Sequence, residues 1–284
     1  MPRGNIPRQP SKAGRQDRVQ NLVDRSSKIP RKPKDGLHGA PELHKAPTPA
    51  KSKSKSAKGY NPIAPARVNE ILKRLDERYP NVTCALHHNS AWELLVATIL
   101  SAQCTDVRVN MVTPALFQKY PSPEHFAALQ PEDLEGDIRS TGFFRNKSKS
   151  LVGAARKVIS DFGGDVPRNM DELLTIPGVA RKTANVVLGS WYKIADGVVV
   201  DTHVQRISRR LELTKNEEPQ KIEQDLMKII PRTRWIDFSH QIIHHGRALC
   251  IARRPKCAEC PLENLCHAAD KTWSTVEIHK SAKP

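Results

Sequence analysis

A chain of 284 residues is long enough for one large domain or two smaller ones, and its formal net charge is +16. No run of 18 apolar residues occurs in it, which excludes a membrane-spanning helix. The first residues, MPRGNIPRQPSKAGRQDR, lack the apolar segment of a secretory signal, so we expect the protein to stay inside the cell.

The positive charge is concentrated near the N-terminus. Residues 1–58 carry 15 Lys and Arg against 4 Asp and Glu, a net charge of +11, whereas the other 226 residues carry 31 against 26, a net charge of +5. The same segment has eight prolines and ends in KSKSKSAK, a composition that cannot bury enough apolar surface to fold. We therefore expect a disordered basic tail that binds an acidic polymer or acts as a solubilising arm.

From about Tyr60 onward, apolar residues recur with helical spacing and no clear alternating strand pattern occurs. The first amphipathic helix is predicted over residues 66–79. Ser90 and Glu93 have the spacing of a capping box ahead of LLVATILSAQ, an apolar helix that should be buried. These patterns favour an all-α fold.

The middle of the chain continues the helical pattern. A helix is expected over residues 106–120, with a break or restart at Pro114. Asn146 is expected to cap a helix that ends at Gly163 and Gly164. Residues 198–200, three valines, resemble a strand but are too few to predict one. Later helices are expected over residues 170–176, 182–191, 202–213, 219–230 and 235–249.

Residues 174–184, LTIPGVARKTA, predict a helix, a tight turn and a second helix. Pro177 should end the first helix, and Gly178 allows the positive φ of a sharp turn. The free backbone N–H groups at the start of the second helix, together with its dipole, can hold a DNA phosphate. An ordinary helical hairpin within a core is the alternative.

Two residues near this hairpin have the chemistry of a covalent catalyst. Lys182 follows Arg181 at the start of the second helix, where a neighbouring cation and the helix dipole favour the neutral, nucleophilic amine. Contact with a phosphate is its competing role. Asp201, in VVVDTHVQR, is the expected N-cap of the next helix, which by itself is a common structural role.

Four of the six cysteines fall within seventeen residues near the C-terminus: Cys250, Cys257, Cys260 and Cys266. Four thiols so close in sequence cannot all face a core, and ligation explains them better than disulfides do. Their spacing suits either zinc or an iron–sulfur cluster. Arg253, Arg254 and Lys256 lie between the first two cysteines, which favours contact with nucleic acid.

Four segments, in the same order along the chain, resemble the endonuclease III family within the helix-hairpin-helix-GPD superfamily of DNA glycosylases: LLVATILSAQCTDVRVN, IPGVARKTANVVL, VDTHVQR and HGRALCIARRPKCAECPLENLC. The resemblance runs from about Asn61 to His267. It implies a two-lobed helical core over residues 59–270, followed by a short tail, 271–284. The first lobe would span about 84–197 and contain the hairpin at 174–184, and the second would combine 61–83 with 198–249, ahead of a cluster loop at 250–266.

The resemblance implies an enzyme that flips an oxidised pyrimidine out of duplex DNA, cleaves its N-glycosidic bond and nicks the abasic site by β-elimination. By position, Lys182 would attack C1′ and form a Schiff base, and Asp201 would activate the lysine and stabilise charge on the sugar. Gln103 matches the residue that fills the space of the flipped base. Phe143 matches the intercalating wedge, with a core contact as its alternative role.

The resemblance also concerns DNA contacts and the cofactor. Gly178 and Ala180 would approach the DNA backbone, and Ala180, which replaces a second hairpin glycine, is expected to be helical already. The four cysteines match the ligands of a [4Fe–4S] cluster, which is favoured over zinc. The expected partner is double-stranded DNA with damaged pyrimidines or abasic sites, bound by a monomer in the bacterial cytoplasm and nucleoid or in a eukaryotic nucleus.

Two other functions are weighed against this one. A monofunctional glycosylase of the mismatch-adenine type lacks the hairpin lysine, whereas this chain has Lys182, and only eighteen residues follow Cys266 for the extra C-terminal domain of such enzymes. A non-catalytic DNA-binding hairpin with a zinc site would have no need of Lys182 and Asp201 together.

Overall fold

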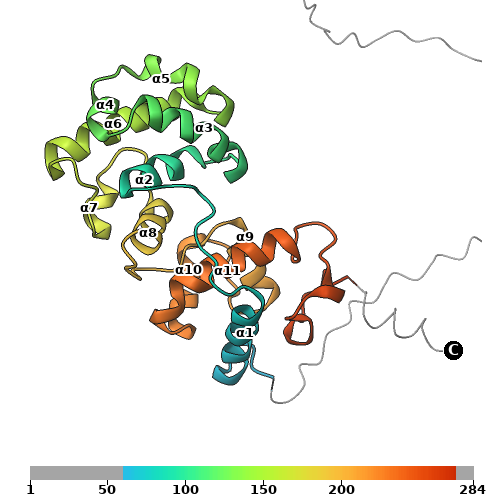
Figure 1. The fold of residues 1–284 in the computed structure, drawn as a ribbon. Helices are drawn as coiled ribbons and strands as arrows, with labels where there is room; N and C mark the ends of the chain where they lie inside the picture. Colours follow the sequence, from blue (N-terminus) through green and yellow to red (C-terminus); the bar gives the residue numbers. More distant parts are fainter. Residues whose placement is uncertain (1–59, 273–284) are drawn as a thin grey trace, which may run out of the picture. The chain divides into compact units, whose positions relative to one another are not determined.

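The computed structural model describes residues 60–272, which lie within one compact unit, Ser56–Pro284. These residues form eleven α-helices and four short 3₁₀ helices and no strand, so the predicted all-α class is confirmed (Figure 1). None of the described helices is long and apolar enough to cross a membrane. The predicted basic tail, 1–58, and nearly all of the tail at 271–284 lie outside the described residues.

One apolar core gathers the helices of the first part of the chain. Nine of the ten residues of α2 are buried, as its continuous apolar sequence predicts, and α2 contacts α3, α6 and α8 around it. The helices of this core are α2 (Ala91–Leu100), α3 (Asp106–Lys119), α4 (Pro123–Ala127), α5 (Pro131–Ile138), η1 (Arg139–Thr141), α6 (Phe144–Phe162), α7 (Met170–Leu174) and α8 (Arg181–Ser190).

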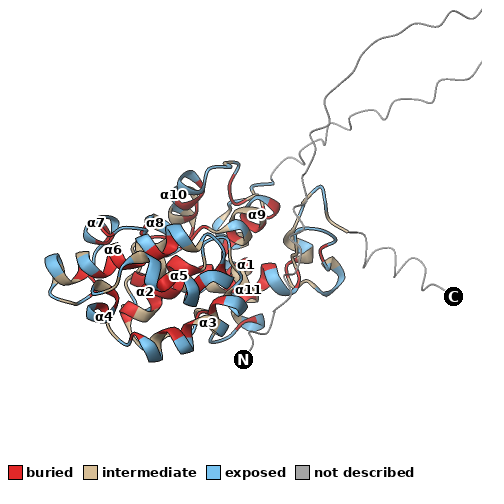
Figure 2. Cartoon of the chain, turned by 90° about the horizontal axis from the view of Figure 1, so that it is seen from above, coloured by how far each residue is buried: buried red, intermediate tan, exposed pale blue. Residues whose placement is uncertain are grey.

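A second core joins the first helix to the last ones. Here α11 packs against both α1 and α9, and Cys250, Cys260 and Cys266 pack at its margin. Its elements are α1 (Pro65–Arg78), α9 (Thr202–Arg210), α10 (Pro219–Ile229), η2 (Arg232–Arg234), α11 (Trp235–Ala248), η3 (Cys257–Glu259) and η4 (Glu263–Leu265). Figure 2 shows buried residues along the inward faces of the helices. The two cores use the segments proposed for two lobes, whose boundaries remain a prediction.

Two caps follow the predicted chemistry closely. Ser90 Oγ accepts a hydrogen bond of 3.1 Å from the N–H of Glu93, and the Glu93 carboxylate returns to the N–H of Asn89, one residue earlier than in a standard box. At the other end of the first core, Gly163 closes α6 in the left-handed conformation, φ 63°, and the N–H of Gly164 donates to Val158 O.

Asn146 is not a helix cap, contrary to the prediction. The chain reverses at Gly142, φ 72°, and Phe143, φ 49°, so that α6 already begins at Phe144. The N–H of Asn146 donates to the carbonyl of Phe143 within the first turn of the helix. A capping residue must stand outside the helix, and here Phe143, three residues before Asn146, has taken that place.

The break expected at Pro114 is also wrong, because α3 runs through it. Proline withholds one N–H from the helix ladder, but Val109, Thr113 and Leu116 bury the same face on both sides of it. The short helices α4 and α5 were missed, although each has proline at its start, Pro123 or Pro131, where proline is favoured. Residues 198–200 are buried but form no strand.

The turn between α7 and α8 depends on Gly178, as predicted. Its φ is +81°, and a Cβ added there would lie 2.7 Å from Ser150 Cβ in α6. Glycine is thus required twice, for the backbone conformation and for the close approach of α6.

Replacing Gly178 by alanine should lower the free energy of unfolding by about 1–2 kcal/mol, because the added methyl group is strained and overpacked. Gly136→Ala is the matched control: it lies inside α5 with nothing within 4 Å of an added Cβ. That change should raise stability by about 0.5–1 kcal/mol. Urea unfolding followed by circular dichroism measures both, and a shift of the same sign in both variants would contradict the requirement for glycine.

Candidate active site

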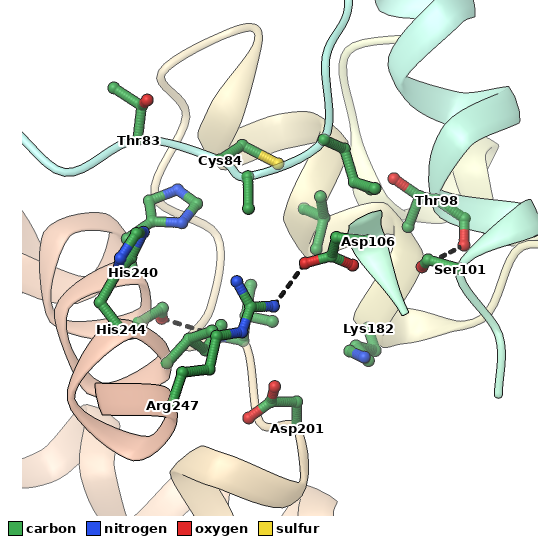
Figure 3. Close-up of a pocket in the computed structure, with 16 residues that line it drawn as sticks. Thr83, Cys84, Thr98, Ser101, Asp106, Lys182, Asp201, His240, His244 and Arg247 are labelled. Atoms are coloured by element: carbon green, nitrogen blue, oxygen red, sulfur yellow. Dashed lines mark hydrogen bonds and ion pairs between the residues drawn. The ribbon is translucent and has the colours of Figure 1, made fainter. Parts of the chain in front are cut away.

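Lys182 and Asp201, the predicted reacting pair, line the same cavity (Figure 3). Lys182 is the second residue of α8 and Asp201 is the N-cap of α9, so the two arrive from different cores. A larger, more open hollow beside this cavity is lined by both residues as well. A concave site where two cores meet is a common place for a substrate to bind.

Backbone hydrogen bonds fix the Asp201 carboxylate. Its Oδ1 accepts from the N–H groups of His203 and Val204, each at 2.8 Å, and the start of the α9 dipole stabilises the negative charge. Its Oδ2 accepts no hydrogen bond from residues 60–272. The structural role of Asp201 as a cap and a chemical role in the cavity are therefore compatible.

Lys182 differs from the arginine beside it. Arg181 Nε donates to Glu223 at 2.8 Å, which directs the guanidinium toward α10. The Lys182 side chain is exposed and has no hydrogen bond or ion pair with any residue of the described chain. Its amine is thus available to a ligand in the cavity.

Charged and histidine side chains line another part of the cavity wall. Arg247, from α11, forms an ion pair with Asp106 at the start of α3. Burial lowers the pKa of His240 to about 4, with His244 and Lys193 acting in the same direction, so the His240 ring is neutral at pH 7. Figure 3 places His240 and His244 on the side away from Lys182.

The hairpin backbone is open to an anion. Ala180 is the N-cap of α8 with φ −102° and ψ 169°, so it is extended, and the expectation that it is already helical is wrong. After the turn at Gly178 the chain buries the side chain of Val179, and α8 begins only at Arg181. With a negative φ, Ala180 replaces glycine without strain. No side chain caps the first N–H groups of α8.

Gln103 and Phe143 share an uncommon backbone conformation. Both are exposed non-glycine residues with positive φ, 52° and 49°. Phe143 is 62 % exposed, which rules out the alternative of a core contact, whereas Phe144 packs on the first core. Strained backbone of this kind concentrates at functional sites. Gln103 lines the larger hollow together with Lys182.

The four clustered cysteines are free thiols, each partly buried, around one cavity with about 340 Å³ of empty space. Burial raises the pKa of Cys260 to about 12 and also raises the pKa of Cys266. Within residues 60–272, no group of three or more His, Cys, Asp or Glu side chains is placed to hold a metal ion. All four cysteines nevertheless line the same cavity.

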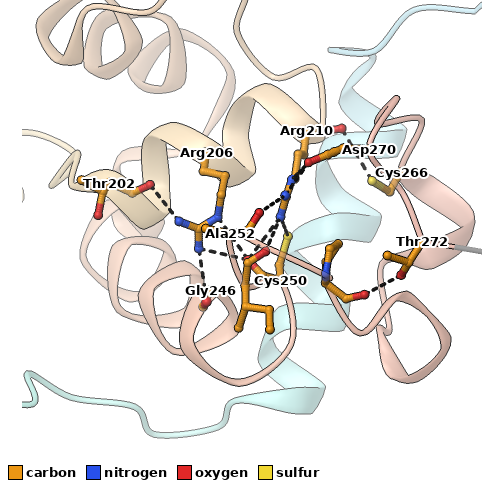
Figure 4. A network of polar contacts seen from close by, with 11 residues as sticks. Thr202, Arg206, Arg210, Gly246, Cys250, Ala252, Cys266, Asp270 and Thr272 are labelled. Carbon is orange, nitrogen blue, oxygen red and sulfur yellow. Dashed lines mark hydrogen bonds and ion pairs between the residues drawn. The ribbon is translucent and has the colours of Figure 1, made fainter.

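Two arginines of α9 support this loop and were missed by the sequence interpretation (Figure 4). Arg210 Nη1 donates to Cys250 Sγ at 3.2 Å, and Arg210 Nε pairs with Asp270 at 3.0 Å. Arg206 Nη2 donates to the carbonyls of Cys250, at 3.0 Å, and Gly246, at 3.2 Å. Their spacing of four residues along one helix face was the available signal.

The three basic residues predicted to contact DNA extend from this supported loop. Arg253, Arg254 and Lys256 are exposed, and none forms an ion pair with another described residue. Arg254 adopts a positive φ of 56°. The loop thus holds three uncompensated charges at the surface.

Comparison with known proteins gives consistent matches. Residues 96–232 match the model of the HhH-GPD superfamily base excision DNA repair proteins, and residues 250–266 match the iron-sulfur binding domain of endonuclease III. Endonuclease III of Synechocystis sp. is 57% identical over 203 residues, covering 72% of this chain and 93% of that protein. Endonuclease III of Bacillus subtilis is 44% identical over 206 residues, covering 72% and 94%.

Two solved structures have the same fold. One is a trapped endonuclease III–DNA covalent intermediate and the other a non-covalent endonuclease III–DNA complex, each 41% identical with a TM-score of 0.69. They cover 72% of this chain, and 96% and 95% of theirs. The match to the iron-sulfur domain confirms a [4Fe–4S] cluster over zinc. The chain belongs to the endonuclease III family, within the HhH-GPD superfamily of base excision DNA repair proteins.

Proposed function

We propose that this protein is a DNA N-glycosylase and abasic-site lyase that removes oxidised pyrimidines from duplex DNA. The observation that carries the proposal is the unpaired amine of Lys182 in one cavity with the fixed carboxylate of Asp201. A monofunctional glycosylase or a non-catalytic hairpin module requires no such amine. The enzyme acts as a monomer on cellular DNA, in the nucleoid of a bacterium or the nucleus of a eukaryote.

Lys182 is the nucleophile of the reaction. Its neutral amine attacks C1′ of the extruded nucleotide, the N-glycosidic bond breaks with its electron pair on the departing base, and the attacking nitrogen loses a proton. Asp201 stabilises the positive charge that develops on the sugar and assists this proton transfer. The ring then opens to a Schiff base, whose iminium acidifies the 2′ hydrogen, and loss of that proton expels the 3′ phosphate.

The remaining site residues bind and distort the DNA. A phosphate oxygen accepts from the uncapped N–H groups of α8, which Gly178 and Ala180 leave accessible. Gln103 fills the space of the extruded nucleotide, and Phe143 inserts between neighbouring bases. The basic loop contacts the DNA backbone at a distance from the reacting sugar.

The cysteine loop is a structural part of this machinery. Cys250, Cys257, Cys260 and Cys266 hold the [4Fe–4S] cluster, which fits four free thiols around one cavity. When bound, the cluster cross-links the loop. Arg210 then connects the loop to α9 through its hydrogen bond to Cys250 Sγ.

Lys182→Ala should abolish the covalent complex that borohydride traps with abasic-site duplex DNA, because the Schiff base requires this amine. Asp201→Asn keeps a good N-cap and should retain the fold while slowing base excision by about 10²-fold or more. Lys228→Ala, an exposed lysine of α10, is the control and should trap like the wild type. Undiminished trapping by the Lys182 variant would disprove its assignment.

The purified protein should be yellow-brown and contain about four iron atoms per chain. Cys257→Ser should lose most of this iron and colour, whereas Cys84→Ser should keep both, since Cys84 lies in the other cavity. Visible absorption and iron analysis measure both effects. A colourless, zinc-loaded wild type would refute the cofactor assignment.

Replacing Arg253, Arg254 and Lys256 by alanine should weaken duplex binding and make its salt dependence shallower. Each lost phosphate contact removes about 0.9 from the slope of log K against log salt. The rate of the bound complex should change little, because these residues lie outside the cavity that holds Lys182. Binding titrations at several salt concentrations measure the slope, and an unchanged slope would place the DNA elsewhere.

A further inference from the structure

Lys147 is a buried cation that the proposed reaction leaves unused. It lies in the first turn of α6, and the residue is only 5 % exposed. No carboxylate accompanies it in the part of the chain that the structure describes, and burial lowers its pKa. Enclosing an ammonium group among apolar residues costs free energy unless its hydrogen bonds are satisfied. The acceptors of Lys147 should therefore show what its burial contributes to the structure.

Lys147 donates to backbone carbonyls at the ends of two different helices. Its Nζ donates to the carbonyl of Leu100 and to the carbonyl of Thr141, each at 2.8 Å. Leu100 is the last residue of α2 and Thr141 is the last residue of η1. A single ammonium therefore closes two helix C-termini, where free carbonyls and the dipole favour a cation.

Each of these helix ends leads directly into a DNA-probing loop. Gln103 is three residues beyond Leu100, and Phe143 is two residues beyond Thr141. Gln103 and Phe143 both have positive φ, 52° and 49°, a conformation that persists only where the surroundings enforce it. The Lys147 ammonium therefore joins the residues at which the two loops begin, Leu100 and Thr141.

The other polar contacts of the loops are local. The N–H of Cys104 donates to Ser101 O within one loop, and Thr141 Oγ1 donates to Ile138 O within the other. Among the hydrogen bonds of residues 60–272, those of Lys147 are the ones that join the two loops.

We propose that Lys147 is a positioning residue for nucleotide extrusion, which sets the separation of the Gln103 and Phe143 loops so that filler and wedge enter the duplex together. The proposal rests on the function proposed above for those two residues. Lys147 is buried and lines neither of the cavities that Lys182 lines. Its effect is therefore confined to substrates whose damaged nucleotide must first leave a base stack.

The test compares two substrates under single-turnover conditions: a damaged pyrimidine paired in a duplex, and an abasic site in a single strand, which needs no extrusion. Lys147→Met keeps the aliphatic stem and removes the donors. Excision from the duplex should fall by about 10- to 100-fold, because the probing residues are misplaced. Borohydride trapping on the single strand should stay within about twofold of the wild type.

A fluorescent adenine analogue beside the lesion reports unstacking directly. Its fluorescence should rise with the wild type and remain low with Lys147→Met. Lys147→Arg, which keeps a cationic donor, should restore part of the rise. Lys157→Met is the control on the same helix, about 15 Å further along, where only a surface ion pair with Asp161 is lost; it should behave like the wild type.

A double-mutant comparison identifies the route of the effect. If Lys147 acts through the loops, Lys147→Met should add little to a Gln103→Ala, Phe143→Ala background. A full additional loss in that background, or equal losses on both substrates, would overturn the proposal. If Lys147→Met does not fold, Lys147→Gln gives the same comparisons. Failure of the wild type on both substrates would instead contradict the proposed function.

Discussion

The capping of α9 by Asp201 is the constraint on which the site depends. Two backbone N–H groups hold one carboxylate oxygen at the start of the helix, so the other oxygen has a fixed direction in the cavity. The same helix carries Arg206 and Arg210 to the cysteine loop. An N-cap contributes about 1 kcal/mol, whereas each hydrogen bond from a charged group contributes about 1.5–3 kcal/mol. The arginine hydrogen bonds therefore hold the cysteine loop against α9 more strongly than the Asp201 cap holds the start of that helix. The Asp201 carboxylate and the cysteine loop are both positioned by the same rigid helix.

The distribution of charge separates the cations held in ion pairs from Lys182, the lysine proposed to react. Arg181 is engaged by Glu223, and Arg247 by Asp106. Lys182 and Asp201 line the same cavity, and neither forms an ion pair with a described residue. Because both arginines are paired with other carboxylates, they do not compete with Lys182 for the Asp201 carboxylate.

The features that could be predicted from the sequence are those with local causes. Ser90 caps α2 because its hydroxyl is three residues from Glu93, and Gly178 forms the turn because its conformation is intrinsic to glycine. Asp201 at an N-cap follows from the same kind of local preference. Lys182 and Asp201, nineteen residues apart, are brought to one cavity by two helices from different cores, and only the family resemblance indicated that meeting.

The features that could not be predicted depend on contacts between distant segments. Asn146 has a capping residue's chemistry, but the reversal at Gly142 starts the helix before it. The exposure of Phe143 depends on how η1 meets α6, and no sequence spacing reports it. The burial of Lys147 could not be predicted from the sequence either, since a lysine in a basic stretch is ordinarily solvated. Its burial results from the convergence of α2, η1 and α6 on one point.

That convergence explains why strained loops are compatible with base extrusion. Loops that were disordered in the free protein would lose conformational entropy on inserting into DNA, about 1–2 kcal/mol for each backbone residue fixed. Loops already held at positive φ by the surrounding helices meet this cost during folding. In the proposed mechanism the apolar burial of the first core would therefore support the distortion of the DNA, and the Lys147 ammonium, bonded to two helix ends, would connect that core to both loops.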